Sequence, residues 1–536
     1  MRASLVNVWR AAVLLVVGAL CAVACVASGT VESSRSAATQ TQPTVPRAEP
    51  SALPAPSVTE ASEAPPGATP VPEPAVETPT SEPAVQPSPE PTLQPTEPPV
   101  ATPTATPEPV ASGPCAVGPL NAPSPNRPNY LVTMDIDPAS GTVSGLINVE
   151  FTLDQDVNEI YFRLWPNGPR PGGGGVEMTI GEAALLVDNE SVGPATAVID
   201  DPTIARYDLP ATVPAGTEIF VAADYKLVVP SELNSRLSGR TDYMRLGTAL
   251  PLLPWVPGQG WVLDPATSLF AEAVVSPVAD YSVNITVPDG YDVLASGVRD
   301  GTNWRVEAAR DFAVSIGRFR TVTAVAMAPD PVQVTVGVHE TIDDNADAYL
   351  DKIVDSLEQF SSRWGAYPWP SLTFALTPNL RGGIEFPTHI MQGPNTIGRT
   401  TSHEVGHMFF YSLVGNNQAT EPWLDEGITS YAEFTYEGVG PGAYEIPSTG
   451  VGNATQPMTF WESRADIYYR SVYGQTGFAL QQLGTQADVD CALARYVADN
   501  AFRVATAADF VAAFEPTFPD IVQRLREFGV DLDAAE

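Results

Sequence analysis

Positive charge, histidine and cysteine are all scarce in this chain of 536 residues. Lysine and arginine number 27 against 63 aspartate and glutamate residues, and the formal net charge is -36. No stretch forms the basic stripe that neutralises phosphate groups, so nucleic acid is excluded as an expected partner. Only four histidines and four cysteines occur. Two histidines that stand close together are therefore informative.

The N-terminus has the pattern of an export signal. Arg2 and Arg10 precede an apolar stretch, Ala11 to Val26, that is short for a membrane span and ends among small residues. We predict a signal peptide over residues 1–27. Cys25 follows Ala-Val-Ala as in bacterial lipoprotein signals. Acylation of Cys25 would tether the protein to a membrane, and plain cleavage nearby is the alternative. We expect an exported protein, either a cell-surface lipoprotein or a secreted one.

Residues 28–113 are rich in proline, threonine and glutamate and lack hydrophobic periodicity. Such a segment cannot bury a core, so we predict a disordered, extended linker. The remaining chain is long enough for two domains, which we place at 114–325 and 326–536. Cys115 and Cys491 are the cysteines left outside the signal. They can form a disulfide in an oxidising compartment or remain two free thiols, and their separation in sequence does not decide between these.

The first of these domains has the pattern of an antiparallel β domain. Short runs rich in valine, isoleucine, threonine and tyrosine alternate with period two between turn residues, as strands with one buried face do. The glycine-rich run near Pro169 is expected to be a flexible loop with no helix start and no phosphate-binding role. The predicted strands are YLVTMDI from Tyr130, GLINVEFTL from Gly145, EIYFRLW from Glu159 and YSVNITV from Tyr281.

The period changes after the strand-like run at Val332. Apolar residues recur every three or four positions from Tyr349 to Trp364, which predicts a helix over about 343–364. A strand-like run at Ser371 and several helical segments follow. The fold class is therefore multidomain, an antiparallel β domain followed by a domain of mixed α and β structure.

The run HEVGH at His403 carries the chemistry. His403 and His407 lie on one face of a helix, where both rings can bind one zinc ion, and Glu404 stands beside them as a general base for the attacking water. A hydrolytic zinc site needs a third protein ligand and one open position. Glu426, nineteen residues after His407 in EPWLDEGIT, can supply that ligand from a second helix. The sequence thus predicts one Zn²⁺ held by His403, His407 and Glu426.

Three runs together resemble the alanyl aminopeptidase family of gluzincin metallopeptidases. They are the zinc signature made by HEVGH, VGN at Val414 and WLDEG at Trp423, then GGIEFP at Gly382, and SVYGQTGFAL at Ser471. The resemblance covers essentially the whole folded region. It implies a saddle-like β domain followed by a thermolysin-like catalytic domain, in a short form without the large helical C-terminal domain of many relatives.

The resemblance also implies roles for single residues. Glu385, with Gly382 and Gly383, would bind the free amino group of a peptide substrate, and Tyr473 would stabilise the oxyanion of the tetrahedral intermediate. Glu433, seven residues after Glu426, would orient a ligand histidine. Tyr468 and Tyr469 compete with Tyr473 for its role.

The chain departs from the family pattern where Ile384 replaces methionine and Phe386 replaces asparagine. We expect an aminopeptidase acting on peptides. The alternatives are a zinc endopeptidase with an open cleft, favoured by the short C-terminus, and a catalytically inactive tethered binding protein of the same fold. Two other histidines carry weaker predictions: His389 either lines the substrate cleft or packs in the core, and His339 stands at an exposed strand end. The oligomeric state is not predicted.

Overall fold

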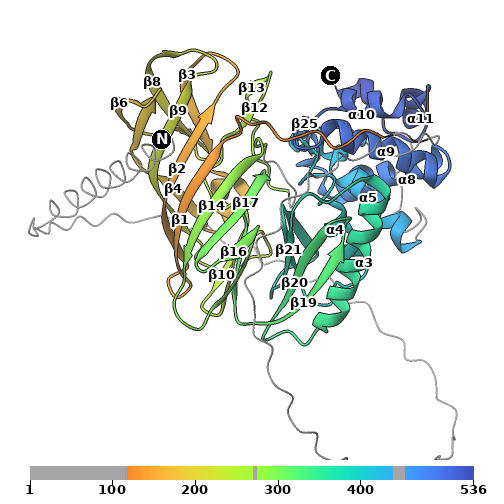
Figure 1. The fold of residues 1–536 in the computed structure, drawn as a ribbon, viewed down its shortest axis with the longest axis horizontal. Coiled ribbons are helices and arrows are strands. Elements are labelled where there is room, and N and C mark those ends of the chain that lie inside the picture. The colour runs from red at the N-terminus through yellow and green to blue at the C-terminus, as the bar shows by residue number, and fades with distance from the viewer. Residues whose placement is uncertain (1–114, 116, 270–274, 439–452, 536) are drawn as a thin grey trace, which may run out of the picture. The chain divides into compact units, whose positions relative to one another are not determined.

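The computed structural model describes Cys115 and residues 117–269, 275–438 and 453–535. The predicted signal peptide with Cys25 and the whole of the predicted linker lie outside these residues. Strands up to β18 form several sheets, and a mixed part of strands and helices follows from β19 onward (Figure 1). Buried apolar side chains of both parts form one continuous cluster.

The largest sheet has nine strands in the order β16-β17-β14-β1-β2-β9-β5-β6, with β4 beside β9. Strand β1 alternates strictly between exposed and buried residues, which is why one face of the sheet covers a core and the other faces solvent. Its strands are β1 (Asn129–Asp137), β2 (Thr142–Thr152), β4 (Glu177–Ile180), β5 (Ala183–Val187), β6 (Glu190–Ala195), β9 (Glu218–Val228), β14 (Ala279–Thr286), β16 (Val298–Asp300) and β17 (Asn303–Ala309).

Two expectations for this part need correction. The sheet is mixed rather than antiparallel, because β1 pairs with β14 in parallel, Asn129 opposite Asp280. The glycine-rich run contains a short helix, α2 (Pro169–Gly173), where a loop without helix was expected. Proline at the first position presets the helical backbone angle and overrides the glycines that follow.

The smaller sheets are β3 (Val157–Arg163), β8 (Ile204–Val213) and β7 (Val198–Asp201); β10 (Leu237–Arg240), β11 (Tyr243–Leu246), β18 (Val314–Gly317) and β15 (Asp292–Ala295); and β12 (Trp255–Val256) with β13 (Gly260–Trp261).

A five-stranded sheet positions the later elements, in the order β19-β20-β21-β23-β22. Its first strand already begins at Phe319, so the boundary predicted between residues 325 and 326 falls inside β19. The chain passes from the earlier sheets to the five-stranded sheet between β18 and β19. The sequence period changes only after the hairpin of β19 and β20, because both of these strands have the same strand-like pattern as the earlier ones. The strands are β19 (Phe319–Met327), β20 (Pro331–His339), β21 (Ser371–Leu376), β22 (Gly383–Phe386) and β23 (His389–Gln392).

Helix α3 (Ala346–Trp364) packs on β19 and β20, and confirms the helix predicted over about 343–364. Asn345 caps its start by accepting the backbone N–H of Asp347. The other helices follow the sheet in sequence (Figure 1). They are α4 (Arg399–Gly406), α5 (Glu426–Glu437), α6 (Met458–Trp461), α7 (Ala465–Tyr468), α8 (Thr476–Gln482), α9 (Gln486–Asn500), α10 (Ala507–Phe514) and α11 (Ile521–Glu527). Among the described residues, no helix has the length and apolar character needed to cross a membrane.

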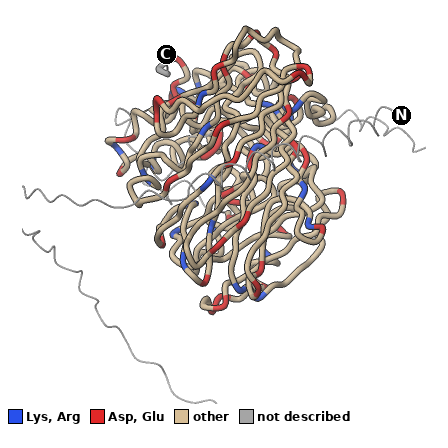
Figure 2. Tube along the Cα trace, turned by 90° about the vertical axis from the view of Figure 1, so that its left-hand side faces the viewer, with Lys and Arg blue, Asp and Glu red and all other residues tan. Residues whose placement is uncertain are grey.

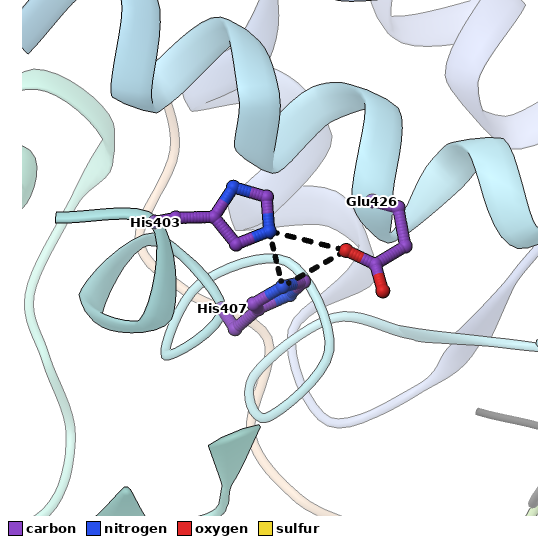
Figure 3. A group of neighbouring side chains, drawn as sticks. All are labelled: His403, His407 and Glu426. Atoms are coloured by element: carbon purple, nitrogen blue, oxygen red, sulfur yellow. Dashed lines mark hydrogen bonds and ion pairs between the residues drawn. The ribbon is translucent and has the colours of Figure 1, made fainter. Parts of the chain in front are cut away.

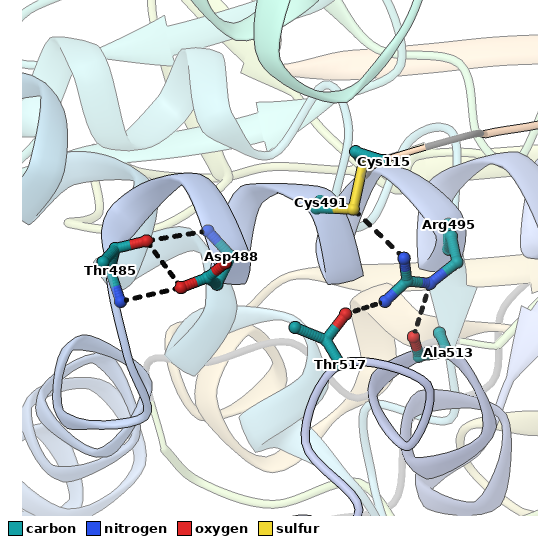
Figure 4. The surroundings of a disulfide bond; sticks show 7 residues. All are labelled: Cys115, Thr485, Asp488, Cys491, Arg495, Ala513 and Thr517. Atoms are coloured by element: carbon teal, nitrogen blue, oxygen red, sulfur yellow. Dashed lines mark hydrogen bonds between the residues drawn. A yellow bond between two sulfur atoms is a disulfide. The ribbon is translucent and has the colours of Figure 1, made fainter. Parts of the chain in front are cut away.

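Cys115 and Cys491 form a disulfide, with Cα atoms 5.5 Å apart. The bond ties the start of the described chain to α9, and Arg495 on the same helix donates to Cys491 Sγ at 3.1 Å (Figure 4). The structure thus resolves the two alternatives that the sequence left open.

Acidic side chains outnumber basic ones along the whole described chain (Figure 2). Two arginines nevertheless lie buried where the β sheets meet the later part. Arg245 on β11 donates to Thr377 Oγ1 at 3.0 Å and to Asn379 O at 3.2 Å. Arg310 donates from Nε to Tyr411 O at 2.9 Å. These bonds hold the loop before β22 and the turn after α4.

Candidate metal centre and active site

The two histidines of HEVGH lie one helical turn apart at the end of α4. His403 is in the last turn and His407 is the C-cap residue. Their ring centroids are 4.7 Å apart, and their Nε2 atoms are 3.1 Å apart. The helix predicted from the sequence therefore presents both rings to the same point.

Glu426 is the first residue of α5, the second helix that the sequence predicted. Its Oε2 lies 3.1 Å from His403 Nε2 and 3.2 Å from His407 Nε2 (Figure 3). The start of α5 packs closely on α8, because a Cβ at Gly427 would come within 2.5 Å of Thr476. The glycine of the DEG run thus allows the close packing that holds Glu426 in place.

This group fits a single zinc ion. Two imidazole nitrogens and one carboxylate oxygen are the donors of a hydrolytic zinc site, and bonds of 2.0–2.1 Å in a tetrahedron place such donors about 3.3 Å apart. The distances of 3.1 to 3.2 Å observed here match that spacing. Buried carboxyl groups also crowd the two rings, and their uncompensated negative charge favours a cation. They are Glu385, Glu404, Asp425, Glu426 and Glu433.

Each ligand histidine has an acidic partner at its other nitrogen. His403 Nδ1 lies 3.2 Å from Glu433 Oε2, and His407 Nδ1 lies 2.7 Å from Asp425 Oδ1. Such contacts fix the ring and leave Nε2 free to bind metal. Burial alone would lower the pKa of His403, but Glu426 and Glu433 outweigh it and raise the pKa to about 9. Glu433 therefore contacts one of the two histidines, and its role in orienting that ring stays a prediction.

Glu404 and Glu385 are both buried, and each has one carboxylate oxygen without a hydrogen-bond partner in the described structure. Burial raises the pKa of both carboxyl groups above the usual range. A cation bound beside them would restore their charged forms. The two unpaired oxygens thus mark positions for a ligand.

Gly383 begins the edge strand β22, and Glu385 is its third residue. A Cβ at Gly383 would lie 2.4 Å from the Cδ of Glu404, so only glycine lets the strand lie against this carboxylate. Gly382, with φ of 95°, makes the preceding turn. The pocket has a volume of about 410 Å³, ordinary for a ligand site. It is lined by Arg381, Gly382, Gly383, Glu385, Arg399, Thr400, His403, Glu404, His407, Glu426, Glu433, Tyr469 and Tyr473.

Tyr473 lies in a π-helical segment, Tyr469–Gln475, before α8. Its ring stacks on His403 with centroids 5.6 Å apart, and its hydroxyl donates to Glu426 Oε1. Local π-helical turns are frequent at functional sites because they redirect a side chain. Of the two competing tyrosines, Tyr469 also lines the pocket, whereas Tyr468 is buried and does not.

The other two histidines lie away from this pocket. His389 is fully buried, with Nε2 2.9 Å from Ser315 Oγ and Nδ1 2.6 Å from Thr373 Oγ1, so it packs in the core and does not line the cleft. His339 ends β20 as expected, but it is buried rather than exposed. Rings on either side cover it, since Phe319 lies on the neighbouring strand and Tyr243 on β11.

The sequence-based predictions did not include Asp425 and Arg399 among the site residues. Asp425 stands next to Glu426 in WLDEG, and its place beside a predicted ligand was a usable signal. Arg399 contacts the carboxylate of Glu433 from the first turn of α4. No feature of the sequence pointed to that contact, which depends on how α4 and α5 pack.

Comparison with known proteins agrees with this geometry. No protein-family model matches the chain. Human aminopeptidase B is 24% identical over 284 residues, which cover 46% of this chain and 43% of that protein. Rat aminopeptidase B is 23% identical over 290 residues, 47% of this chain and 43% of that protein. The chain therefore matches less than half the length of these relatives.

Solved structures match over a longer span. The M1 zinc metallopeptidase of Deinococcus radiodurans gives a TM-score of 0.55 at 15% identity, covering 75% of this chain and 94% of that one. A variant of that protein with a bound Tyr-Ser-Ala substrate gives a TM-score of 0.57 at 15% identity, with the same coverage.

The fold is that of the M1 zinc metallopeptidases, and the converging His-His-Glu group offers a site for one zinc ion. The chain is thus similar in sequence to part of aminopeptidase B and in fold to the M1 zinc metallopeptidases.

Proposed function

We propose that this chain is a zinc-dependent aminopeptidase that removes N-terminal residues from peptides. The assignment of single roles rests on where the side chains lie. His403, His407 and Glu426 hold the metal, and a zinc ion in this group supplies Lewis acidity to the attacking water and the substrate carbonyl.

The chain's own residues handle the proton and the substrate. Glu404 accepts a proton from the attacking water on its unpaired Oε2 and passes it to the leaving amine. Tyr473 donates a hydrogen bond to the oxyanion as charge develops there. Tyr473 now donates to Glu426 Oε1, so its hydroxyl must turn toward substrate when substrate binds.

The observation that carries the proposal is the unpaired Oε1 of Glu385. This oxygen is buried, lines the pocket and has no hydrogen-bond partner among the described residues. The ammonium group at the start of a peptide is a charged donor that would satisfy it. A free amino terminus then becomes a condition of binding.

One comparison tests this directly. A peptide with a free amino terminus and the same peptide acetylated there are incubated with the zinc-loaded protein. We expect stepwise release of N-terminal residues from the free peptide and a loss of at least about a hundredfold in kcat/KM on acetylation, since a buried charge pair is broken. Equal cleavage of both would contradict the role of Glu385. Internal cuts would favour an endopeptidase, and no cleavage of either peptide would favour an inactive binding protein.

We also propose that the protein is exported and tethered through an acylated Cys25, with the proline-rich segment as spacer. The support is the sequence pattern of residues 1–27 and the Cys115–Cys491 disulfide, a bond typical of oxidising compartments. Mass spectrometry of the mature N-terminus tests it: a diacylglyceryl group on Cys25 is expected, and an unmodified N-terminus elsewhere would contradict the tether.

A further inference from the structure

The two sulfur atoms of the Cys115–Cys491 disulfide lie in different surroundings. Cys115, at the start of the described chain, is exposed, whereas Cys491 on α9 is only 8% exposed. Thiol–disulfide exchange begins when a thiolate reaches one sulfur atom of the bond, so access helps to decide which sulfur is attacked. An external thiol therefore attacks Cys115 more readily, and Cys491 becomes the leaving group.

Arg495 contacts the sulfur atom that would leave. Its Nη1 donates to Cys491 Sγ at 3.1 Å, from one turn further along α9. The rest of the guanidinium is held in place, because Nε donates to Ala513 O at 3.0 Å and Nη2 donates to the hydroxyl of Thr517 (Figure 4). A cation fixed beside a sulfur atom stabilises the thiolate relative to the thiol, and a stabilised thiolate leaves faster.

The acidic side chains that flank Cys491 on α9 are engaged elsewhere. Asp488 accepts hydrogen bonds from the residue that caps the start of the helix. Asp490 pairs with an arginine of α3. Arg495 forms no ion pair with any described residue, Asp499 one turn further along α9 included. The positive charge of Arg495 is therefore available to the sulfur atom of Cys491.

We propose that Cys115 is a thiol-exchange site, at which a low-molecular-weight thiol forms a mixed disulfide while Cys491 leaves as a thiolate paired with Arg495. The attacking thiolate supplies the electron pair of the new S–S bond to Cys115 Sγ, and the electron pair of the old bond stays on Cys491 Sγ. Attack by Cys491 on Cys115 reverses the step and returns the thiol. Attack by a second thiol on the mixed disulfide instead yields the oxidised external thiol and two reduced cysteines.

The exchange makes the stability of the fold depend on external thiols. The bond closes a sequence separation of 376 residues, and opening it returns conformational freedom to the unfolded chain. Neither cysteine lines the peptidase pocket, so the inference does not depend on the proposed function. We expect zinc content and peptidase activity at 25 °C to be the same with and without a thiol on Cys115.

Reduced glutathione is the probe. It is incubated with the folded, zinc-loaded protein, the reaction is quenched with acid, and mass spectrometry of the peptic peptides locates the attached glutathione. We expect at least about tenfold more label on Cys115 than on Cys491. Arg495→Met should slow formation of the mixed disulfide about three- to tenfold and lower the labelling ratio, because only attack at Cys115 uses Cys491 as leaving group. Arg495→Lys should restore part of both.

Arg524→Met is the matched control. Arg524 on α11 also donates to a backbone carbonyl, that of Leu483, but it does not contact the disulfide. This variant should keep the wild-type rate and labelling ratio. Because Arg495→Met also removes the contacts to Ala513 and Thr517, its labelling ratio decides, and not its rate. Equal labelling of the two cysteines in the wild type, or an unchanged ratio in Arg495→Met, would overturn the inference.

Discussion

Glu404 and Glu426 are carboxylates buried beside the same two imidazoles, and their contacts separate their roles. Glu426 Oε2 lies within 3.2 Å of both Nε2 atoms, whereas Glu404 has an oxygen without a partner. We predict that Glu404→Gln lowers kcat by about a hundredfold to ten-thousandfold, the usual contribution of a general base. Zinc content, measured by plasma mass spectrometry, should stay at the wild-type level.

Glu426→Gln is the matched comparison, because it changes the same atoms at a ligand position. It should lose zinc as well as activity. If Glu404→Gln lost its zinc, or kept its activity, the division between base and ligand would be wrong.

The buried imidazole of His389 should make the stability of the fold sensitive to acid. Burial lowers its pKa from 6.5 to about 3, so the unfolded chain binds the proton more tightly than the folded one below pH 6.5. The stability contributed by neutral His389 is present above pH 6.5 and is lost as the pH falls toward 3. The loss is about 1.4 kcal/mol per pH unit, or about 2 kcal/mol at pH 5.

Urea denaturation of the wild type and of His389→Asn between pH 4.5 and 7.5 measures this contribution. The free-energy difference between the two proteins should be largest near pH 7.5 and should shrink as the pH falls. A difference independent of pH would contradict a neutral buried imidazole.

The positions of the site residues could be predicted where local spacing determines them. The i, i+4 relation of His403 and His407 follows from helix geometry, and the DEG run pointed to Glu426. His339 and His389 could not be placed, because their burial depends on strands distant in sequence: Thr373 and Ser315 enclose His389 from two different sheets.

At the scale of elements, Arg245 connects β11 to the loop that leads into β22. Its buried guanidinium donates to five oxygen atoms, which belong to Leu233, Ser235, Thr377, Pro378 and Asn379. It thereby fixes the segment from which Arg381, Gly383 and Glu385 project.

We predict that Arg245→Met lowers the free energy of unfolding by about 2–4 kcal/mol, since it leaves several buried carbonyl groups unpaired. Below the melting temperature it should also raise KM for free-amino peptides more than it lowers zinc content. Thermal melting, steady-state kinetics and metal analysis on one preparation check both parts. Unchanged KM would mean that the loop keeps its position without Arg245.

Helix and strand patterns in the sequence identified most elements near the site, including α3, β20 and β21. The helix in the glycine-rich run and the parallel pairing of β1 with β14 were missed. The helix depends on a proline at its first position. The parallel pairing joins strands that begin 150 residues apart, at Asn129 and Ala279, and no local sequence pattern encodes it.

At the scale of the whole molecule, the Cys115–Cys491 bond closes a loop with a sequence separation of 376 residues. Replacing both cysteines by serine should lower stability by about 2–4 kcal/mol, because the unfolded chain regains the freedom that the bond removes. Peptidase activity at 25 °C should change little, since both cysteines lie outside the pocket. Denaturation with and without reductant checks this, and reductant should have no effect on the double variant.

The class of fold was predictable because strand and helix patterns occupy different stretches of the chain. The boundary between the two parts was harder to predict. Strand β19 belongs to the later sheet, but its sequence pattern is the same as that of the earlier strands. The joining of the two parts through Arg245 and Arg310 is a tertiary feature that only the structure reveals.

A zinc titration followed by peptidase activity tests the central claim most directly. The protein is stripped with a chelator, zinc is added in fractions of one equivalent, and hydrolysis of an aminoacyl amide reporter is measured at each step. Activity should rise in proportion to zinc and stop rising at one equivalent per chain. Activity in the stripped protein, or a rise that continues to two equivalents, would contradict a single catalytic ion held by His403, His407 and Glu426.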